Sequence, residues 1–266
     1  MSKIENWLRG AMGQGRKEME VNFSDVLDAQ RGIDGSLLEE SVAIWCALLR
    51  AQQNTWTWEG LSSGDYLEIG VLNGKSASVL AHFSRAYGNC LTIVDPIIQY
   101  RTRQTLDAIS PRVSYLEIVS ENLRFSEYHR KNLRSLSFAH IDGMHRFSAV
   151  MSDIAACEDM LGPFGVISID DFHTDLFPQI PAAVYRYLYS GVSDLCIFLI
   201  GFNKAYLCRN IAKKYYMRFV REGLLQALEA MGKKLTLVKT DRNDNFNAFA
   251  IAAFQGERLY GNEHET

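Results

Sequence analysis

The sequence predicts an α/β protein with a doubly wound, mostly parallel seven-stranded sheet, helices on both faces of the sheet and an N-terminal helical arm. Two observations predict this fold. From residue 65 onward, short apolar runs alternate with longer stretches of helical periodicity, which is the pattern of right-handed βαβ units. The chain has 266 residues, of which 47% are hydrophobic and 22% charged, enough to bury the core of one such domain.

The N-terminal part is expected to form an arm and one helix. Residues 1–35 are punctuated by glycines and are expected to be loosely held. Ser36 has the features of a helix N-cap, with Glu39 three residues later, and predicts a helix to about Gln52. The expected domains are an arm and cap helix over 1–60, the main domain over 61–256 and a flexible tail over 257–266.

The main domain is expected to contain seven strands and several helices between them. One helix near 150–161 carries an apolar stripe at spacings of four, three and four, with polar residues between. A further strand pair is expected near 235–238 and 248–254. The other expected helices are 75–87, 180–189 and 213–231, and the seven expected strands are 66–69, 91–94, 113–119, 137–141, 166–169, 195–200 and 205–208.

Charge and cysteine usage exclude several classes of protein. The net charge of −3 and the pI near 6.1 argue against an extended phosphate-binding face, so no nucleic-acid partner is expected. The longest strongly apolar stretch, 195–202, is too short to cross a bilayer, and the first residues show no secretory signal. The five cysteines form no CxxC pair and are expected to be reduced core residues. A cytoplasmic protein that binds no membrane is expected.

Small or acidic residues follow four of the first five predicted strands: Gly70, Asp95, Asp142 and Asp170. Ligands of open α/β sheets bind beyond the carboxyl ends of the strands, so these positions are expected to share one crevice. Any single aspartate among them has the alternative role of a cap for the following helix. Their common position at one edge favours a ligand site.

The first turn carries features of a nucleoside site. Gly70 and Gly74 allow a tight turn close to a ligand, and the helix that follows offers free N–H groups. The turn lacks the third glycine of a dinucleotide fingerprint, and Glu68 would repel phosphate but suits an ammonium group. Asp95 lies where an acid binds ribose hydroxyls. A nucleoside with an amino-acid tail therefore fits better than NAD.

With these motifs, the chain resembles class I S-adenosylmethionine-dependent methyltransferases, and among them the metal-dependent small-molecule O-methyltransferases of the catechol and macrolide-sugar type. The resemblance covers about 64–172, through the Glu-x-Gly-x-x-x-Gly-x-Ser turn, Ile-Asp-Gly-x-His and Ile-Asp-Asp. It implies a Rossmann-like sheet. The residues that it implies for S-adenosylmethionine are Glu68, Gly70, Asn73, Gly74, Ser76, Asp95, Ser120 and Asp142. Ser120 has the alternative role of a plain turn residue.

The resemblance also implies a divalent cation, Mg²⁺ or a similar ion, on Asp142, Asp170 and Asp171. Hard cations prefer carboxylate oxygens and keep waters that substrate oxygens can replace. The catechol type has an asparagine where this chain has Asp171, whereas the macrolide-sugar type has an Asp-Asp pair, which favours a sugar or alcohol acceptor. In the alternative interpretation, Asp171 caps the next helix.

His145 is the expected base, because it lies three residues after Asp142, where the metal-dependent group has its lysine or histidine. An imidazole titrates near neutral pH and can accept a hydroxyl proton. His173 is a weaker candidate, and His82, His129 and His140 are interpreted as helix-surface or strand residues. The acceptor pocket is expected from 54–59, with Trp56 and Trp58, from 172–177 and from 242–246.

The sequence therefore predicts methyl transfer to a hydroxyl of a small molecule (sugar, alcohol or catechol-like), with the acceptor as the partner and a homo-oligomer as an option. Three alternatives stay open: a metal-independent small-molecule N- or C-methyltransferase, a nicotinamide-dependent oxidoreductase, and a catalytically silent cofactor-binding subunit. Activity that does not depend on a metal would favour the first alternative, and function that persists without His145 would favour the last.

Overall fold

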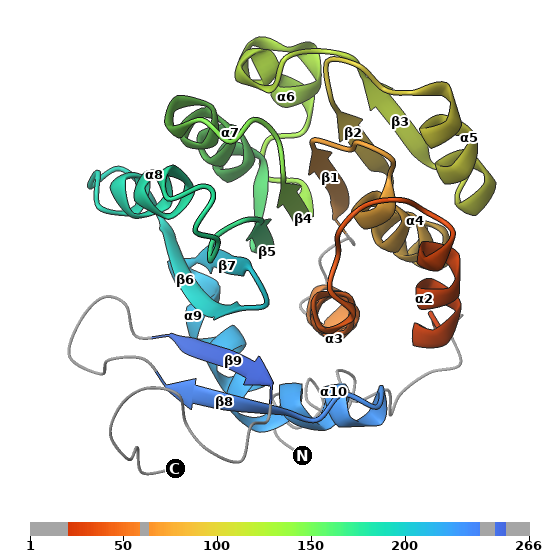
Figure 1. Ribbon diagram of the computed structural model, residues 1–266. Coiled ribbons are helices and arrows are strands. Elements are labelled where there is room, and N and C mark those ends of the chain that lie inside the picture. Colours follow the sequence, from red (N-terminus) through yellow and green to blue (C-terminus); the bar gives the residue numbers. More distant parts are fainter. Residues whose placement is uncertain (1–20, 59–63, 240–247, 254–266) are drawn as a thin grey trace.

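The computed structural model describes residues 21–58, 64–239 and 248–253, with the side chains of 54–58 left out. Nine strands form one sheet in the order β3-β2-β1-β4-β5-β7-β6-β9-β8 (Figure 1). The predicted α/β class is confirmed in this part of the chain. The predicted number of seven strands is wrong, because the C-terminal strand pair joins the same sheet through the β6–β9 pairing.

The first half of the sheet is parallel and the second half is mixed. The strands β1 to β5 pair in parallel with their neighbours, whereas β7 runs antiparallel to both β5 and β6, and β8 runs antiparallel to β9. The strands are β1 (Asp65–Ile69), β2 (Leu91–Val94), β3 (Val113–Leu116), β4 (Leu136–Ile141), β5 (Leu161–Ile169), β6 (Leu195–Gly201), β7 (Lys204–Arg209), β8 (Leu235–Lys239) and β9 (Phe249–Ala253).

Helices cover both faces of the sheet, as predicted. The elements are α2 (Phe23–Arg31), α3 (Glu39–Trp58), α4 (Lys75–Tyr87), α5 (Tyr100–Ile109), η1 (Ser120–Phe125), α6 (Glu127–Lys131), α7 (Phe147–Met160), α8 (Gln179–Leu188), α9 (Asn210–Phe219), η2 (Val220–Leu224) and α10 (Leu225–Ala230). In Figure 1, α3 is seen end-on inside the curve of the sheet, whereas α6, α7 and α8 lie on its outer side.

Several element boundaries differ from the prediction. The helix predicted from Ser36 begins at Glu39 and continues to Trp58, beyond the predicted end near Gln52. The helix predicted over 213–231 is interrupted by a π-helical turn at η2. The third strand ends at Leu116, three residues early, and Ser120 opens η1. The arm expected over 1–35 contains α2, and its first twenty residues lie outside the described part of the chain.

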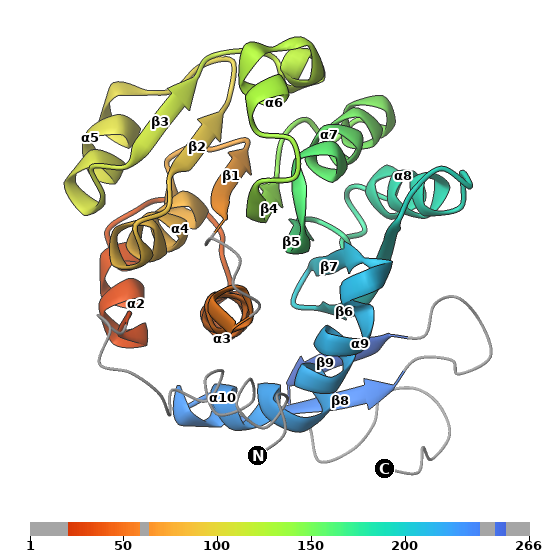
Figure 2. The same cartoon turned by 180° about the vertical axis from the view of Figure 1, so that it is seen from behind.

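Each face of the sheet has its own hydrophobic core because side chains alternate along the strands. Tyr66 of β1 joins the core shared with α2, α3, α4, α9 and α10, whereas Leu67 joins the core shared with α7 and α8. Figure 2 shows the same two layers from behind. The two cores hold the carboxyl ends of β1, β2, β4 and β5 side by side at one edge.

No described helix is long and apolar enough to span a membrane. All five cysteines are free, and four of them are buried as predicted. The prediction is wrong for Cys90, which is exposed.

Candidate active site

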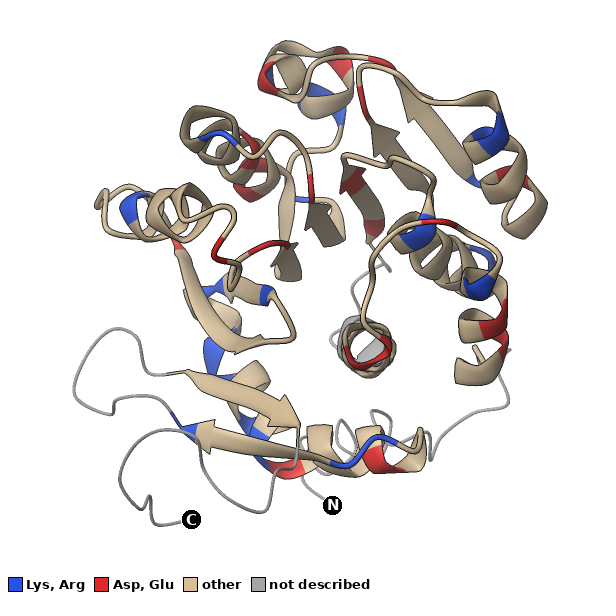
Figure 3. Cartoon of the chain, in the orientation of Figure 1, with Lys and Arg blue, Asp and Glu red and all other residues tan. Residues whose placement is uncertain are grey.

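A cavity of about 840 Å³ opens at the carboxyl ends of the parallel strands. Its walls come from the turns after β1, β2, β4 and β5, the start of η1, the segment before α3 and the turn between β6 and β7. Acidic segments follow β4 and β5 in Figure 3. Nine of the eleven predicted site residues line this cavity: Gly70, Asn73, Ser76, Asp95, Ser120, Asp142, His145, Asp170 and Asp171.

The first turn has the tight geometry that its glycines predict. Gly70 has a φ of +83°, and a Cβ at this position would lie 2.0 Å from the carbonyl oxygen of Asp142. Gly74 has a φ of +87° and is the N-cap residue of α4. The turn after β1 can therefore pack directly on the turn after β4, since it carries no side chain at the contact.

Glu68 and Gly74 are the two predicted residues that do not line the cavity. Glu68 is completely buried in β1, and its Oε1 accepts a hydrogen bond from Ser76 Oγ. Its second oxygen, Oε2, has no hydrogen-bond partner among the described residues. A buried carboxylate oxygen without a partner is costly, so this atom is available to a cationic or N–H donor.

Asp95 is held in place by the backbone on both sides. Its Oδ2 accepts from the N–H of Val71 and its Oδ1 accepts from the N–H of Ile97, each at 3.0 Å. These bonds tie the turn after β1 to the turn after β2. Ser120 is 8% exposed and lies at the first position of η1, so both predicted residues reach the cavity from fixed backbone.

Asp142, His145 and Asp171 form a half-buried cluster in the cavity wall. The Nε2 atom of His145 lies 3.5 Å from Asp142 Oδ1 and 3.2 Å from Asp171 Oδ2, and the imidazole ring contacts Phe177 at 4.1 Å between ring centroids. The hydrogen bond to Asp142 and the charge of Asp171 raise the pKa of His145 against the opposing effect of burial. The cluster can accept a proton at the imidazole or hold a cation at the carboxylates.

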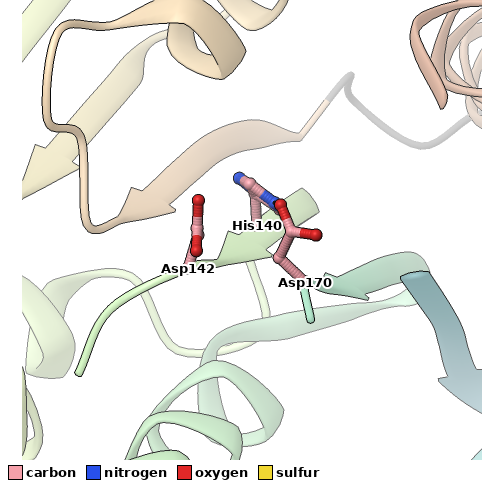
Figure 4. Close-up of side chains that lie close together, drawn as sticks. All are labelled: His140, Asp142 and Asp170. Carbon is pink, nitrogen blue, oxygen red and sulfur yellow. The ribbon is translucent and has the colours of Figure 1, made fainter. Parts of the chain in front are cut away.

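A second cluster lies deeper and brings together side chains from β1, β4, β7 and the turn after β5. Figure 4 shows His140 of β4 beside Asp170, with Asp142 directly after the end of β4. His140 Nδ1 lies 3.3 Å from Glu68 Oε1, and His140 Nε2 lies 3.2 Å from Lys204 Nζ, which also donates to Asp170 Oδ2. Burial opposes ionisation of Asp170, but the Lys204 ammonium and His140 hold the pKa of this carboxyl below its usual range.

The sequence analysis missed two members of this cluster. His140 was interpreted as an ordinary strand residue, and Lys204 was not considered. His140 is completely buried and Lys204 is 1% exposed, although charged and polar residues rarely reach such positions without partners. A histidine inside one predicted strand and a lysine directly before another were the signals that the sequence offered.

The three predicted metal ligands, Asp142, Asp170 and Asp171, do not form one group of neighbouring ligand atoms. Among the described residues, the groups with ligand atoms within 4.8 Å of one another are His140, Asp142 and Asp170, and Asp142, His145 and Asp171. Both oxygens of Asp170 have intramolecular donors, Oδ1 from the N–H of Asp171 at 2.8 Å and Oδ2 from Lys204. Asp142 and Asp171 are the pair that fits a hard divalent cation, which commonly takes one or two carboxylates and keeps waters.

Large apolar side chains surround the mouth of the cavity. They are about half exposed or more, from 45% at Val119 to 77% at Ile97. Phe172 is buried, whereas the side chains of Trp56 and Trp58 and the segment 242–246 lie outside the described part of the chain. The apolar residues at the mouth are Leu38, Leu72, Ile97, Val119 and Met144.

Residues 67–172 match the family described as Methyltransferase domain. This range begins in β1 and ends just after Asp171, so it contains every predicted site residue. No curated protein sequence matches the chain.

Among the solved structures that match the chain at low sequence identity, three are named as methyltransferases. The MycE methyltransferase from the mycinamycin biosynthetic pathway, in complex with Mg, SAH and mycinamycin VI, is 14% identical with a TM-score of 0.54, over 74% of this chain and 55% of that chain. CalS11, a TDP-rhamnose 3′-O-methyltransferase, is 14% identical with a TM-score of 0.46, over 73% and 95% of the two chains. The O-methyltransferase NovP is 13% identical with a TM-score of 0.48, over 77% and 97%.

Proposed function

We propose that the protein, whose residues 67–172 match the family described as Methyltransferase domain, transfers a methyl group from S-adenosylmethionine to a hydroxyl group of a small molecule. The observation that carries the proposal is the position of His145. Its Nε2 faces two carboxylates in the wall of the cavity that the glycine turn after β1 also lines. A proton acceptor and a nucleoside-type turn therefore face the same space.

The turn after β1 is proposed to hold the methionine end of the cofactor. The unpartnered Oε2 of Glu68 suits the ammonium group, and the first N–H groups of α4, including the backbone N–H of Ser76, suit the carboxylate. Asp95 is proposed for the ribose and Ser120 for the adenine, with Asn73 and the backbone around Gly70, Gly74 and Asp142 completing the site.

His145 is proposed to accept the hydroxyl proton at Nδ1, while its Nε2–H faces the two carboxylates. The imidazolium that forms keeps this Nε2–H directed toward Asp142 and Asp171, so the two carboxylates stabilise the charge that develops. The hydroxyl oxygen then attacks the sulfonium methyl in line, its C–O bond forming as the C–S bond breaks. The cavity wall contributes by holding the oxygen near the methyl carbon.

Asp142 and Asp171 are proposed to hold a divalent cation. Their side chains are 35% and 21% exposed, which leaves room for waters or acceptor oxygens in the remaining positions. A bound cation would polarise the acceptor hydroxyl and lower its pKa. MycE, the neighbour with the same fold, carries Mg in its complex.

The acceptor is proposed to combine a hydroxyl with an apolar body. The hydroxyl must reach the His145 cluster, whereas Leu38 and Met144 offer exposed apolar surface at the mouth. A sugar or alcohol attached to a larger apolar group meets both requirements, since apolar area removed from water stabilises the bound state.

One observation favours the metal-independent alternative. Lys204 already supplies a positive charge to Asp170. A cation site made of three carboxylates would instead need Asp170 without such a partner. Sensitivity to chelators distinguishes the two, because loss of turnover in EDTA requires a cation.

Titration calorimetry with S-adenosylhomocysteine tests the proposal, run with Mg²⁺ and again with EDTA. Micromolar binding in both conditions is expected, because the proposed cofactor residues do not overlap Asp171. Turnover with hydroxyl acceptors is expected to require the cation and to be lost in Asp142→Ala. Absence of binding to S-adenosylhomocysteine under every condition would overturn the proposed function.

A further inference from the structure

The turn between β6 and β7 presents two consecutive side chains to two consecutive acids. Lys204 donates to Asp170 Oδ2, and Asn203 Nδ2 donates to Asp171 Oδ1 at 2.8 Å. The acids follow β5, whereas the turn lies more than thirty residues later and reaches them because β7 pairs antiparallel with β5. One turn thus sets the surroundings of both acids.

The turn itself is firmly held. Its two central residues, Phe202 and Asn203, have φ values of 51° and 64°, in the left-handed region that tight hairpins require. The carbonyl of Asn203 accepts from the N–H of Phe172 at 3.0 Å, and its Oδ1 accepts from the N–H of His173 at 3.1 Å. Ser41 of α3 donates to the carbonyl of Phe202. The positions of Asn203 and Lys204 are therefore determined by the fold.

Asp170 and Asp171 differ in which carboxylate oxygens remain accessible to a cation. Asp170 has both carboxylate oxygens bonded inside the chain, one of them to a buried ammonium. Asp171 accepts from Asn203 at Oδ1, whereas its Oδ2 lies in the cavity wall 3.2 Å from His145 Nε2 and has no lysine or arginine partner among the described residues. A carboxylate paired with a buried lysine offers little to a cation, because the cation would have to approach the ammonium.

We propose that this turn gives the two acids different roles. Lys204 pairs with Asp170, so that Asp170 is not a ligand of the cation. Asn203 orients Asp171, so that its Oδ2 binds the cation together with Asp142. The inference rests on the proposed function for its cation and assigns to this turn the reason why two of the three carboxylates bind it. Lys204 and Asn203 are positioning residues, since each acts through the acid that it contacts.

The charges agree with this division. Asp142, Asp170 and Asp171 carry three negative charges, and Lys204 returns one positive charge to the same edge of the cavity. Without Lys204, Asp170 would be a buried carboxylate beside the cation-binding pair and would become a third ligand.

The test is Mn²⁺ binding measured by electron paramagnetic resonance, on the full chain in the absence of acceptor. Lys204→Met is expected to increase Mn²⁺ affinity about tenfold or more, because it frees Asp170. Asn203→Gly keeps the left-handed backbone and is expected to lower Mn²⁺ affinity by about tenfold to a hundredfold, the usual effect of losing a group that orients a ligand. Neighbouring substitutions are therefore expected to act in opposite directions.

The double variant Asp170→Asn with Lys204→Met is the matched control, since it removes the ion pair at constant net charge. Its Mn²⁺ affinity is expected to stay within about threefold of that of the unaltered protein, well under the loss seen when a group that supports a ligand is removed. A loss of tenfold or more in the double variant, or no gain in Lys204→Met, would overturn the inference. Circular dichroism checks that each variant is folded.

Binding of S-adenosylhomocysteine in EDTA, measured on the same samples, separates this inference from the proposed function. If the nucleoside binds but the Mn²⁺ affinities do not follow the expected order, only the ligand assignment fails. If the nucleoside does not bind the unaltered protein, the proposed function fails, whatever the Mn²⁺ affinities are.

Discussion

Ser76 at the start of α4 donates its hydroxyl to the buried carboxylate of Glu68 in β1. This bond joins the two ends of the glycine turn and leaves Glu68 Oε2 without a partner among the described residues. The carboxylate therefore supports the turn, and its second oxygen is the atom proposed above to accept from the ammonium group of the cofactor.

Glu68→Gln is expected to weaken binding of S-adenosylhomocysteine more than Ser76→Ala does. Glutamine keeps the size of the side chain but loses the charge that suits an ammonium group. Hydrogen bonds to charged groups contribute about 1.5–3 kcal/mol, so a loss of about tenfold to a hundredfold in affinity is expected. Titration calorimetry measures it, and an affinity equal to that of the unaltered protein would exclude Glu68 from the ligand site.

His145→Ala is expected to reduce kcat by about a hundredfold to ten-thousandfold, the usual contribution of a general base. Affinity for S-adenosylhomocysteine should change little, because the imidazole contacts carboxylates and Phe177 rather than the glycine turn. His173→Ala is the control, since His173 is exposed and makes no described contact with the carboxylates of Asp142 and Asp171. An equal loss of kcat in both variants would contradict the role of His145.

The pKa of His145 in EDTA is expected to lie above the usual value of 6.5, because Asp142 and Asp171 stabilise the imidazolium. Asp142→Asn removes the largest favourable contribution and is expected to lower this pKa. In the unaltered protein, the acidic limb of the pH–rate profile is expected to follow the pKa of His145, since the base must be unprotonated to act. NMR titration of the imidazole C–H signals measures the shift, and an unchanged pKa in Asp142→Asn would contradict the contact.

Gly70→Ala is expected to destabilise the fold more than Gly88→Ala. Both glycines have positive φ values, +83° and +76°, so both substitutions carry the left-handed strain of about 1–2 kcal/mol. A Cβ at Gly70 would also meet the Asp142 carbonyl at 2.0 Å, whereas nothing lies within 4 Å at Gly88. The steric conflict is expected to add about 1–3 kcal/mol. Urea denaturation compares the two free energies of unfolding, and equal values would show that the turns do not pack as described.

The parallel half of the sheet and its ligand edge could be predicted from the sequence. Strands β1, β2, β4 and β5 are short apolar runs, and each is followed directly by the predicted residue, as at Gly70 and Asp142. These features are local, because each strand and the site residue that follows it are adjacent in the sequence. The relation of His145 to Asp142, three residues apart, is local for the same reason.

The sequence by itself determined the strands of the sheet, most of the longer helices and the residues that reach the carboxyl edge of the sheet, whereas α2, α5 and α6 were not predicted. Only the tertiary structure decided that Lys204 pairs with Asp170 and that His140 lies between Lys204 and Glu68. These contacts join residues between 34 and 72 positions apart, and they depend on β7 entering the sheet antiparallel beside β5. Hydrophobic periodicity shows which side of a strand is buried but not which strand lies next to it, so the partners of buried charges followed only from the packed sheet.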